Sequence, residues 1–96
     1  MKTANEIATI TEKACLERIA KRHDSTMNLI NYTLAPRVED AAKQGDTDIR
    51  FRIDPDLDRD LVVSVFSAQG YDVKYRGYDM AISWLNAYLK IRVNSK

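Results

Sequence analysis

Four aspartates stand at every second position between residues 54 and 60, in the stretch DPDLDRD. Carboxylates at this spacing are typical of calcium loops, which also need a glycine at loop position 6 and a bidentate glutamate at position 12. Counted from Asp54, these two positions hold Arg59 and Val65. The stretch instead predicts the start of a helix, with Asp54 as its cap, proline in its first position and the next aspartates opposing the positive end of its dipole. We expect no metal site.

Two residue types that often carry catalysis occur once each, as His23 and Cys15. His23 falls among apolar residues at helical spacing, which favours a packed or interface histidine over a catalytic base. Cys15 has no second cysteine with which to form a disulfide or a CxxC metal site, and we interpret it as a small buried hydrophobic residue. The glycines, at positions 45, 70 and 77, are too far apart for a phosphate-binding loop. The sequence therefore predicts neither an enzyme nor a cofactor.

The residues best suited to binding are cations that alternate with apolar residues in three short stretches. Interpreted as strands, these stretches place one set of side chains against a core and the other set on the opposite face of a sheet. The core-facing set would be Ile49, Phe51, Ile53, Val73, Tyr75, Leu89, Ile91 and Val93. The opposite face would carry Arg50, Arg52, Lys74, Arg76, Lys90 and Arg92, with Tyr78 and Tyr88 close by.

Such a face has a definite chemistry. Arginine pairs hold carboxylates and phosphates in a fork, and tyrosine rings stack on bases. It would suit an anionic small molecule such as a signalling nucleotide, or an acidic surface on another protein. The alternative is an ordinary solvated sheet face, on which Asp48, Asp54 and Asp72 balance the cations.

A long helix must precede this sheet. Thr3 and Glu6 form a capping box, so we expect the helix to begin near Ala4. The helical pattern lasts to about Gln44, and Gly45 is suited to the left-handed conformation that ends a helix.

Pro36 lies inside this helical pattern. A proline lacks the amide hydrogen and crowds the carbonyl four residues earlier, which predicts a kink or a break near Leu34 or Ala35. An unbroken helix would be roughly 60 Å long, well beyond the diameter of a domain of this size.

The first part of this helix, residues 1–34, has little of its own chain to pack on. Apolar residues recur along it at steps of three and four, so an apolar surface would face water unless another molecule covered it. We expect this segment to associate with further copies of the chain. The interface would comprise Ile7, Ile10, Leu16, Ala20, His23, Met27 and Ile30.

The remainder, residues 35–96, should form a compact α+β core. Alternation predicts a strand at 48–54 and another at 71–75 that turns at Gly77, with a short helix at 55–69 between them. We interpret residues 80–93 as two strands joined near Asn86 and Ala87, although Ile82, Leu85 and Leu89 also fit one face of a helix. The predicted architecture is a single α+β domain in the order α-β-α-β-β(-β), with the long helix and a second short helix on a sheet of three to four strands.

The composition limits the partners. With 15 basic and 14 acidic residues the formal charge is +1, so no broad basic surface is expected for nucleic acid. The first residues, MKTANEIATITEK, contain no continuous apolar run, which argues against a signal peptide or a membrane anchor. We expect a cytoplasmic protein.

The layout has a counterpart. A long helix ending in AAKQGD, the strand IRFRI, a helix ending in AQGYDVKY and a turn before ISW resemble a class of small uncharacterised proteins encoded by bacteriophages, over about residues 35–84. This chain departs from that layout by continuing past Trp84 into LNAYLKIRV. The resemblance implies a bacterial host cytoplasm and either a virion component or an accessory factor that blocks a host protein or sequesters a signalling molecule.

Together these features predict a binding protein that acts stoichiometrically, either by inhibiting a host protein or by sequestering an anionic ligand. The alternative is a structural or assembly protein, associated with the virion, in which the long helix is the main functional element.

Overall fold

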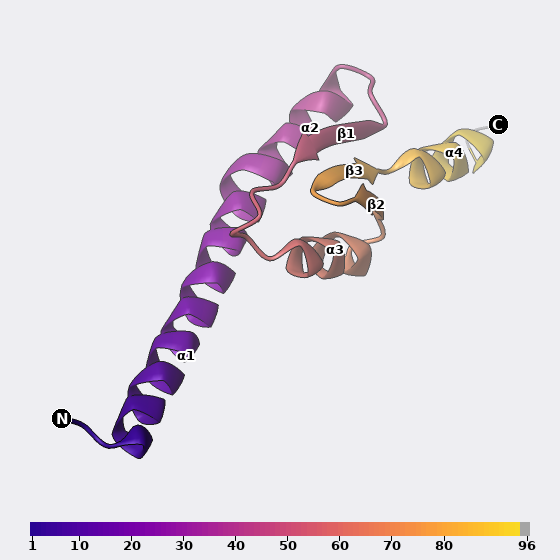
Figure 1. Cartoon of the computed structure of the whole chain (residues 1–96). Helices are drawn as coiled ribbons and strands as arrows, with labels where there is room; N and C mark the ends of the chain where they lie inside the picture. The colour runs from indigo at the N-terminus through magenta and orange to yellow at the C-terminus, as the bar shows by residue number, and fades with distance from the viewer. Residues whose placement is uncertain (95–96) are drawn as a thin grey trace.

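The computed structural model describes residues 1–94, and Figure 1 shows a long helix that carries a small α+β unit at one end. The elements follow in the order α1 (Ala4–Leu29), η1 (Ile30–Leu34), α2 (Ala35–Lys43), β1 (Asp48–Arg52), α3 (Arg59–Ala68), β2 (Asp72–Arg76), β3 (Asp79–Ser83) and α4 (Leu85–Asn94). The predicted α+β class is confirmed.

The molecule is elongated, measuring 75 × 22 × 19 Å along its principal axes. Its radius of gyration is 18.8 Å, whereas a compact chain of this length would have about 12 Å. The difference arises from α1, most of which extends away from the sheet (Figure 1).

Capping interactions fix both ends of the long helical path. At the start, the amide of Glu6 donates to Oγ1 of Thr3 over 3.2 Å, as the capping pattern predicts. At the end, Gly45 has a φ of +88° and the amide of Asp46 donates to the carbonyl of Ala41 over 3.0 Å. These are features of a glycine-terminated helix.

Pro36 does not break the helix. The path passes through the π-helical turn η1, closed by the Ala35 amide donating to the carbonyl of Ile30, and continues as α2. A π turn is wider than an α turn, so it gives the proline ring room against the preceding carbonyls. The helix is therefore continuous, as Figure 1 shows, and the predicted interruption is only a local widening at η1.

The three strands form an antiparallel sheet in the order β1-β3-β2, with β3 in the centre. β2 and β3 form a hairpin whose turn contains Gly77 at a φ of +62°. One face of the sheet packs against the helices, and its side chains include the predicted Ile49, Phe51, Ile53 and Val73. Tyr75 lies under the guanidinium of Arg59 from α3, whose carbon is 4.2 Å from the ring centroid.

The core lies between this face and the helices. Its buried hydrophobic residues are Ile30, Leu34, Val38, Ile49, Ile53, Val62, Phe66, Met80 and Ile82. They come from η1, α2, α3 and the sheet, so the core uses only the C-terminal half of the long helix. Within the described part of the chain, the N-terminal half contributes no residue to this core.

Thr26 joins α1 to the loop before α3. Its buried hydroxyl donates to the carbonyl of Arg22 over 2.7 Å and accepts from the amide of Asp58 over 2.8 Å. Arg22 also donates to the carbonyl of Leu57 over 2.9 Å. These bonds fix the point at which α1 leaves the α+β unit.

We therefore expect Thr26→Val to lower the free energy of unfolding by about 1–3 kcal/mol, because the Asp58 amide would lose its acceptor while the side-chain shape is kept. Chemical denaturation measures this loss. Thr33→Val makes the same change at an exposed position of η1 and should have little effect. Equal losses for the two variants would contradict the role given to Thr26.

The start of the second helix differs from the prediction. Asp54 does not cap it; its carboxylate accepts from the amide of Asp56 over 2.9 Å in a separate turn. The helix begins at Arg59, where the carboxylate of Asp58 accepts from the amide of Leu61 over 3.1 Å. The bond from Asp58 to Thr26 holds the cap one turn later than the sequence pattern suggests.

The last predicted strand is wrong. Residues 85–94 form α4, and Leu89, Ile91 and Val93 are exposed instead of facing the core. The helix starts where the side-chain hydroxyl of Ser83 accepts from the amide of Leu85 over 3.2 Å, and the Tyr88 amide then donates to the carbonyl of Trp84. The core-facing side of the sheet is already filled by the other elements. A fourth strand would therefore lose these local hydrogen bonds without gaining buried apolar contacts in return.

Candidate binding surfaces

The outer face of the sheet consists of three rows of side chains. Because both outer strands pair with β3 in the same register, each residue of β3 has one neighbour on either side. The first row is Asp48–Ser83–Asp72, the second Arg50–Ala81–Lys74 and the third Arg52–Asp79–Arg76. The face therefore carries four cations, in the second and third rows, and three acids, in the first and third rows.

The predicted basic face is only partly assembled. Arg50, Arg52, Lys74 and Arg76 lie on it and are exposed. Tyr78 lies in the turn at one end of the same sheet. Placing Lys90, Arg92 and Tyr88 on the sheet face was wrong, because α4 carries all three.

The middle row differs from the other two, since it has no acid. Arg50 and Lys74 flank the small side chain of Ala81, and a cavity of about 560 Å³ opens beside them toward Ser83 and Asn86. Acids nevertheless lie close. A carboxylate oxygen of Asp48 is 3.5 Å from Nε of Arg50, and the Asp72 carboxylate at the far edge accepts from the side-chain Nδ2 of Asn86 over 2.7 Å. The row could hold one anionic group, and the negative charges of Asp48 and Asp72 would lower its affinity for that group.

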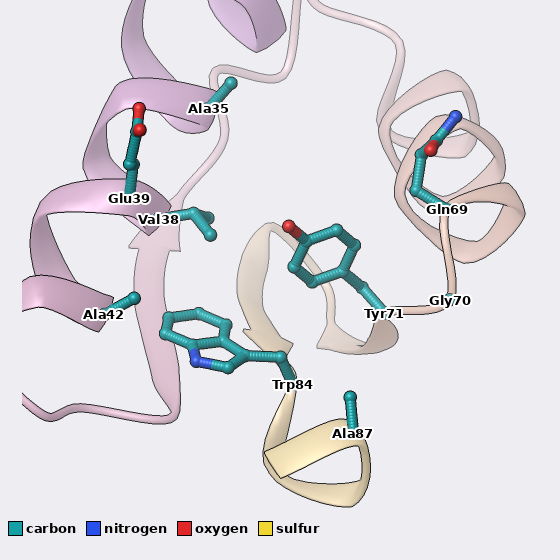
Figure 2. A pocket seen from close by; sticks show the side chains of 9 residues that line it. All are labelled: Ala35, Val38, Glu39, Ala42, Gln69, Gly70, Tyr71, Trp84 and Ala87. Atoms are coloured by element: carbon teal, nitrogen blue, oxygen red, sulfur yellow. The ribbon is translucent and has the colours of Figure 1, made fainter. Parts of the chain in front are cut away.

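A second cavity, of about 490 Å³, lies on the helical side of the molecule. Figure 2 shows the rings of Tyr71 and Trp84 between α2 on one side and the end of α3 on the other. These rings meet edge to face, with centroids 6.3 Å apart, and Tyr71 meets Phe66 in the same way at 5.4 Å. Half-buried aromatic rings of this kind form apolar binding surfaces.

This cavity continues toward η1. A neighbouring hollow of about 330 Å³ shares four lining residues with it and reaches Ile30 and Asn31. We call the two together the aromatic groove. Its lining residues are Ile30, Asn31, Ala35, Val38, Glu39, Ala42, Val65, Phe66, Gln69, Gly70, Tyr71, Trp84 and Ala87. Glu39 is the one charged residue among them.

This groove was not predicted from the sequence. A signal was present, because Ala35, Val38 and Ala42 recur at helical spacing on α2 and an aromatic residue follows Gly70. What the pattern could not give is the separation between α2 and α3, which leaves part of Trp84 uncovered.

The protruding part of α1 is the third surface. Every residue from Met1 to Ser25 is exposed. Four large apolar side chains on it have exposed fractions of about one half to two thirds: Ile7 51%, Ile10 49%, Leu16 61% and Ile19 65%.

The predicted interface on this helix is thus divided. Ile7, Ile10, Leu16, Ala20 and His23 are exposed and accessible to a second molecule. Ile30 belongs to the chain's own core and Met27 packs against that core, so neither lies on the exposed part of the helix. Ile19 was not predicted but lies among the exposed apolar residues.

The single histidine and cysteine also lie on this helix. Cys15 is exposed, so its interpretation as a buried residue was wrong within one chain. His23 is exposed too, with Nδ1 3.6 Å from a carboxylate oxygen of Asp24. Among the residues that the structure describes, no group of three or more histidine, cysteine or acidic side chains is arranged to hold a metal ion.

None of the helices within residues 1–94 combines the length and the apolar character that crossing a membrane requires. Comparisons with protein-family models, with curated proteins and with solved structures found no match to this chain.

Proposed function

We propose that the protein is a non-enzymatic assembly and binding protein that self-associates through α1. The observation that carries this proposal is the run of exposed residues from Met1 to Ser25, in which Ile7, Ile10, Leu16 and Ile19 have no neighbours from the α+β unit. Large exposed apolar patches on a folded protein mark sites of interaction with another molecule.

The size of the surface supports this reading. A stable protein interface involves about 20–30 residues from each partner. The exposed part of α1 runs from Ala4 to Ser25 and so supplies a helix of that size by itself. An isolated helix of this length gains little from propensity alone, and in proteins packing of a helix against another surface stabilises it.

The outer sheet face supports a weaker role than its sequence suggested. Four cations remain there, and Asp48, Asp72 and Asp79 lie among them. We therefore place the assembly role first. In the setting that the resemblance to phage proteins suggests, the protein would act stoichiometrically in a bacterial cytoplasm, as a virion-associated component or as a multivalent inhibitor of a host protein.

Native mass spectrometry of the full-length protein, purified from cells, tests this proposal. We expect a defined oligomer. A protein that is monomeric at every concentration would contradict the proposal, and a bound anion seen in the same spectrum would bear on the second candidate function.

That second candidate is sequestration of an anionic small molecule on the outer sheet face. It rests on the row Arg50–Ala81–Lys74, where two cations flank a methyl group with no acid in the row and a cavity opens beside them. Hydrogen bonds to charged groups contribute about 1.5–3 kcal/mol each, so this pair could hold one phosphate or carboxylate group.

If this site is used, Arg50→Glu with Lys74→Glu will weaken binding of pyrophosphate at least about tenfold, since each reversal replaces an attraction by a repulsion. Isothermal titration calorimetry measures the change. Arg52→Glu with Arg76→Glu alters the net charge equally in the row that already contains Asp79 and should have a smaller effect. Equal losses would indicate a general charge effect and contradict a site at Arg50 and Lys74.

A further inference from the structure

We propose that the aromatic groove of one chain receives the N-terminal end of α1, residues 4–16, from a second copy, in an antiparallel two-fold dimer. This inference rests on the proposed self-association and adds where the helix binds and in which direction. It connects two surfaces that each lack a partner within the chain.

The positions of the two surfaces along one helix determine the direction. The groove is lined on the long helix by residues between Ile30 and Ala42, close to its C-terminal end, whereas Ile7, Ile10 and Leu16 lie close to its N-terminal end. A parallel pair would set like ends side by side and leave both grooves empty. An antiparallel pair brings each apolar end to the partner's groove and closes after two chains.

The spacing agrees with this arrangement. The helical path from Ala4 to Lys43 has its midpoint between His23 and Asp24. About a two-fold axis at that point, residue 16 lies level with residue 31 of the partner, and residue 5 lies level with residue 42. The helix segment 5–16 is therefore about as long as the groove, roughly 17 Å at about 1.5 Å per residue.

The chemistry of the two surfaces matches as well. Glu39 is the one charged residue lining the groove. On the helix, residues 7–11 read IATIT and residues 14–16 read ACL, so charge occurs between Ile7 and Leu16 only at Glu12 and Lys13. Burying such a segment against Tyr71 and Trp84 would remove apolar surface from water with few charges to desolvate.

The distribution of apolar residues around α1 has the same explanation. At about 100° per residue, Ile7, Ile10 and Ala14 share one side of the helix. Ala8, Cys15 and Ile19 lie about 130° further round the helix, and Leu16 lies nearly opposite the first group. A helix that packs on one surface needs a single apolar stripe. A helix that lies in a groove with two walls, here α2 and the end of α3, needs apolar residues on both sides.

The area is also sufficient. By symmetry each chain would supply one helix end and one groove, so the contact occurs twice. The exposed helix together with the groove residues reaches the 20–30 residues a side that a stable dimer involves, about 800 Å² from each partner.

Cross-linking through the native Cys15 tests the direction. In the antiparallel dimer, Cys15 of one chain lies beside the turn of the partner's helix that contains the groove residue Asn31. The two copies of Cys15 lie about 25 Å apart along the helix axis. In the full-length Asn31→Cys variant, a short bis-maleimide should therefore link Cys15 of one chain to the introduced cysteine of the other. The link should disappear when Cys15→Ser is added.

Each result separates this inference from the proposed function. A link between two copies of Cys15 in the wild-type protein would indicate parallel helices and overturn the inference. A dimer that forms neither link would also overturn it, because the groove would then be free or filled by another segment such as α4, while self-association itself would stand. A monomer would overturn both.

Trp84 gives an independent readout, because it is the single tryptophan and lines the groove. Its emission should move to longer wavelength when the dimer dissociates on dilution, as partner residues leave the ring. An emission maximum that stays constant through a dissociation detected by light scattering would contradict occupation of the groove.

Discussion

Replacing Ile7 and Ile10 together by glutamate will weaken self-association of the full-length chain by at least about a hundredfold. Burying an isoleucine side chain contributes about 1.5–3 kcal/mol, and each 1.4 kcal/mol changes a dissociation constant tenfold. The two side chains are 51% and 49% exposed in the single chain, so about half of each remains to be buried, and each glutamate adds the cost of desolvating a charge. Sedimentation equilibrium measures the constant directly.

Lys2→Glu provides the matched control, because it makes the same change in net charge just before residues 4–16 without removing apolar surface. It should change the dissociation constant much less. Circular dichroism should show that both variants keep the fold, since residues 2–10 have no contact with the core. If the double variant associated as tightly as the wild type, α1 would not be the interface at these residues.

The second large effect concerns the core. Ile82→Ala should lower the free energy of unfolding by about 2–5 kcal/mol, because removing buried methyl groups loses both their transfer energy and the packing around them. Ile82 is fully buried on β3, the central strand, between Ile49 and Val73 of the two outer strands. Since small domains have total stabilities of about 5–15 kcal/mol, this single change could unfold much of the population.

Ile91→Ala removes the same atoms from α4, where the side chain is 67% exposed. Its effect should stay within about 0.5 kcal/mol. Urea denaturation of the two variants at one protein concentration keeps the contribution of self-association the same for both. Similar losses would mean that α4 packs more closely in solution than its exposure indicates.

Much of the fold could be predicted from local patterns. Alternation located β1 and β2, and Gly45 and Gly70 located the ends of two helices, because strand pleating and left-handed helix ends depend on a few adjacent residues. The prediction was less accurate where a residue distant in the sequence determines where an element begins. The bond from Asp58 to Thr26 moves the start of α3, and the pattern of α3 alone could not reveal it.

The end of the chain shows a second limit. LKIRV alternates as a strand should, yet it is helical in α4, because the sheet's inner face is already filled and Ser83 starts a helix locally. This one error had placed Lys90 and Arg92 on the predicted basic face, although α4 carries both. The four cations that remain are those on β1 and β2, where the period was correctly interpreted.

The candidate surfaces differ in how visible they are in the sequence. The exposed end of α1 was predictable, because a helix of this length exceeds what so short a chain can cover. The aromatic groove was not, because it depends on the spacing of α2 and α3 across the sheet. The proposed binding of α1 in the groove follows only from comparing the positions of the two surfaces along the same long helix.

Small-angle X-ray scattering of the wild-type protein over a range of concentrations tests the central claim most directly, because it gives mass and shape together. Self-association through α1 predicts the mass of two chains and a radius of gyration above the 18.8 Å of the single chain, with dissociation on dilution. A mass of one chain with a radius near 18.8 Å at every concentration would contradict the account.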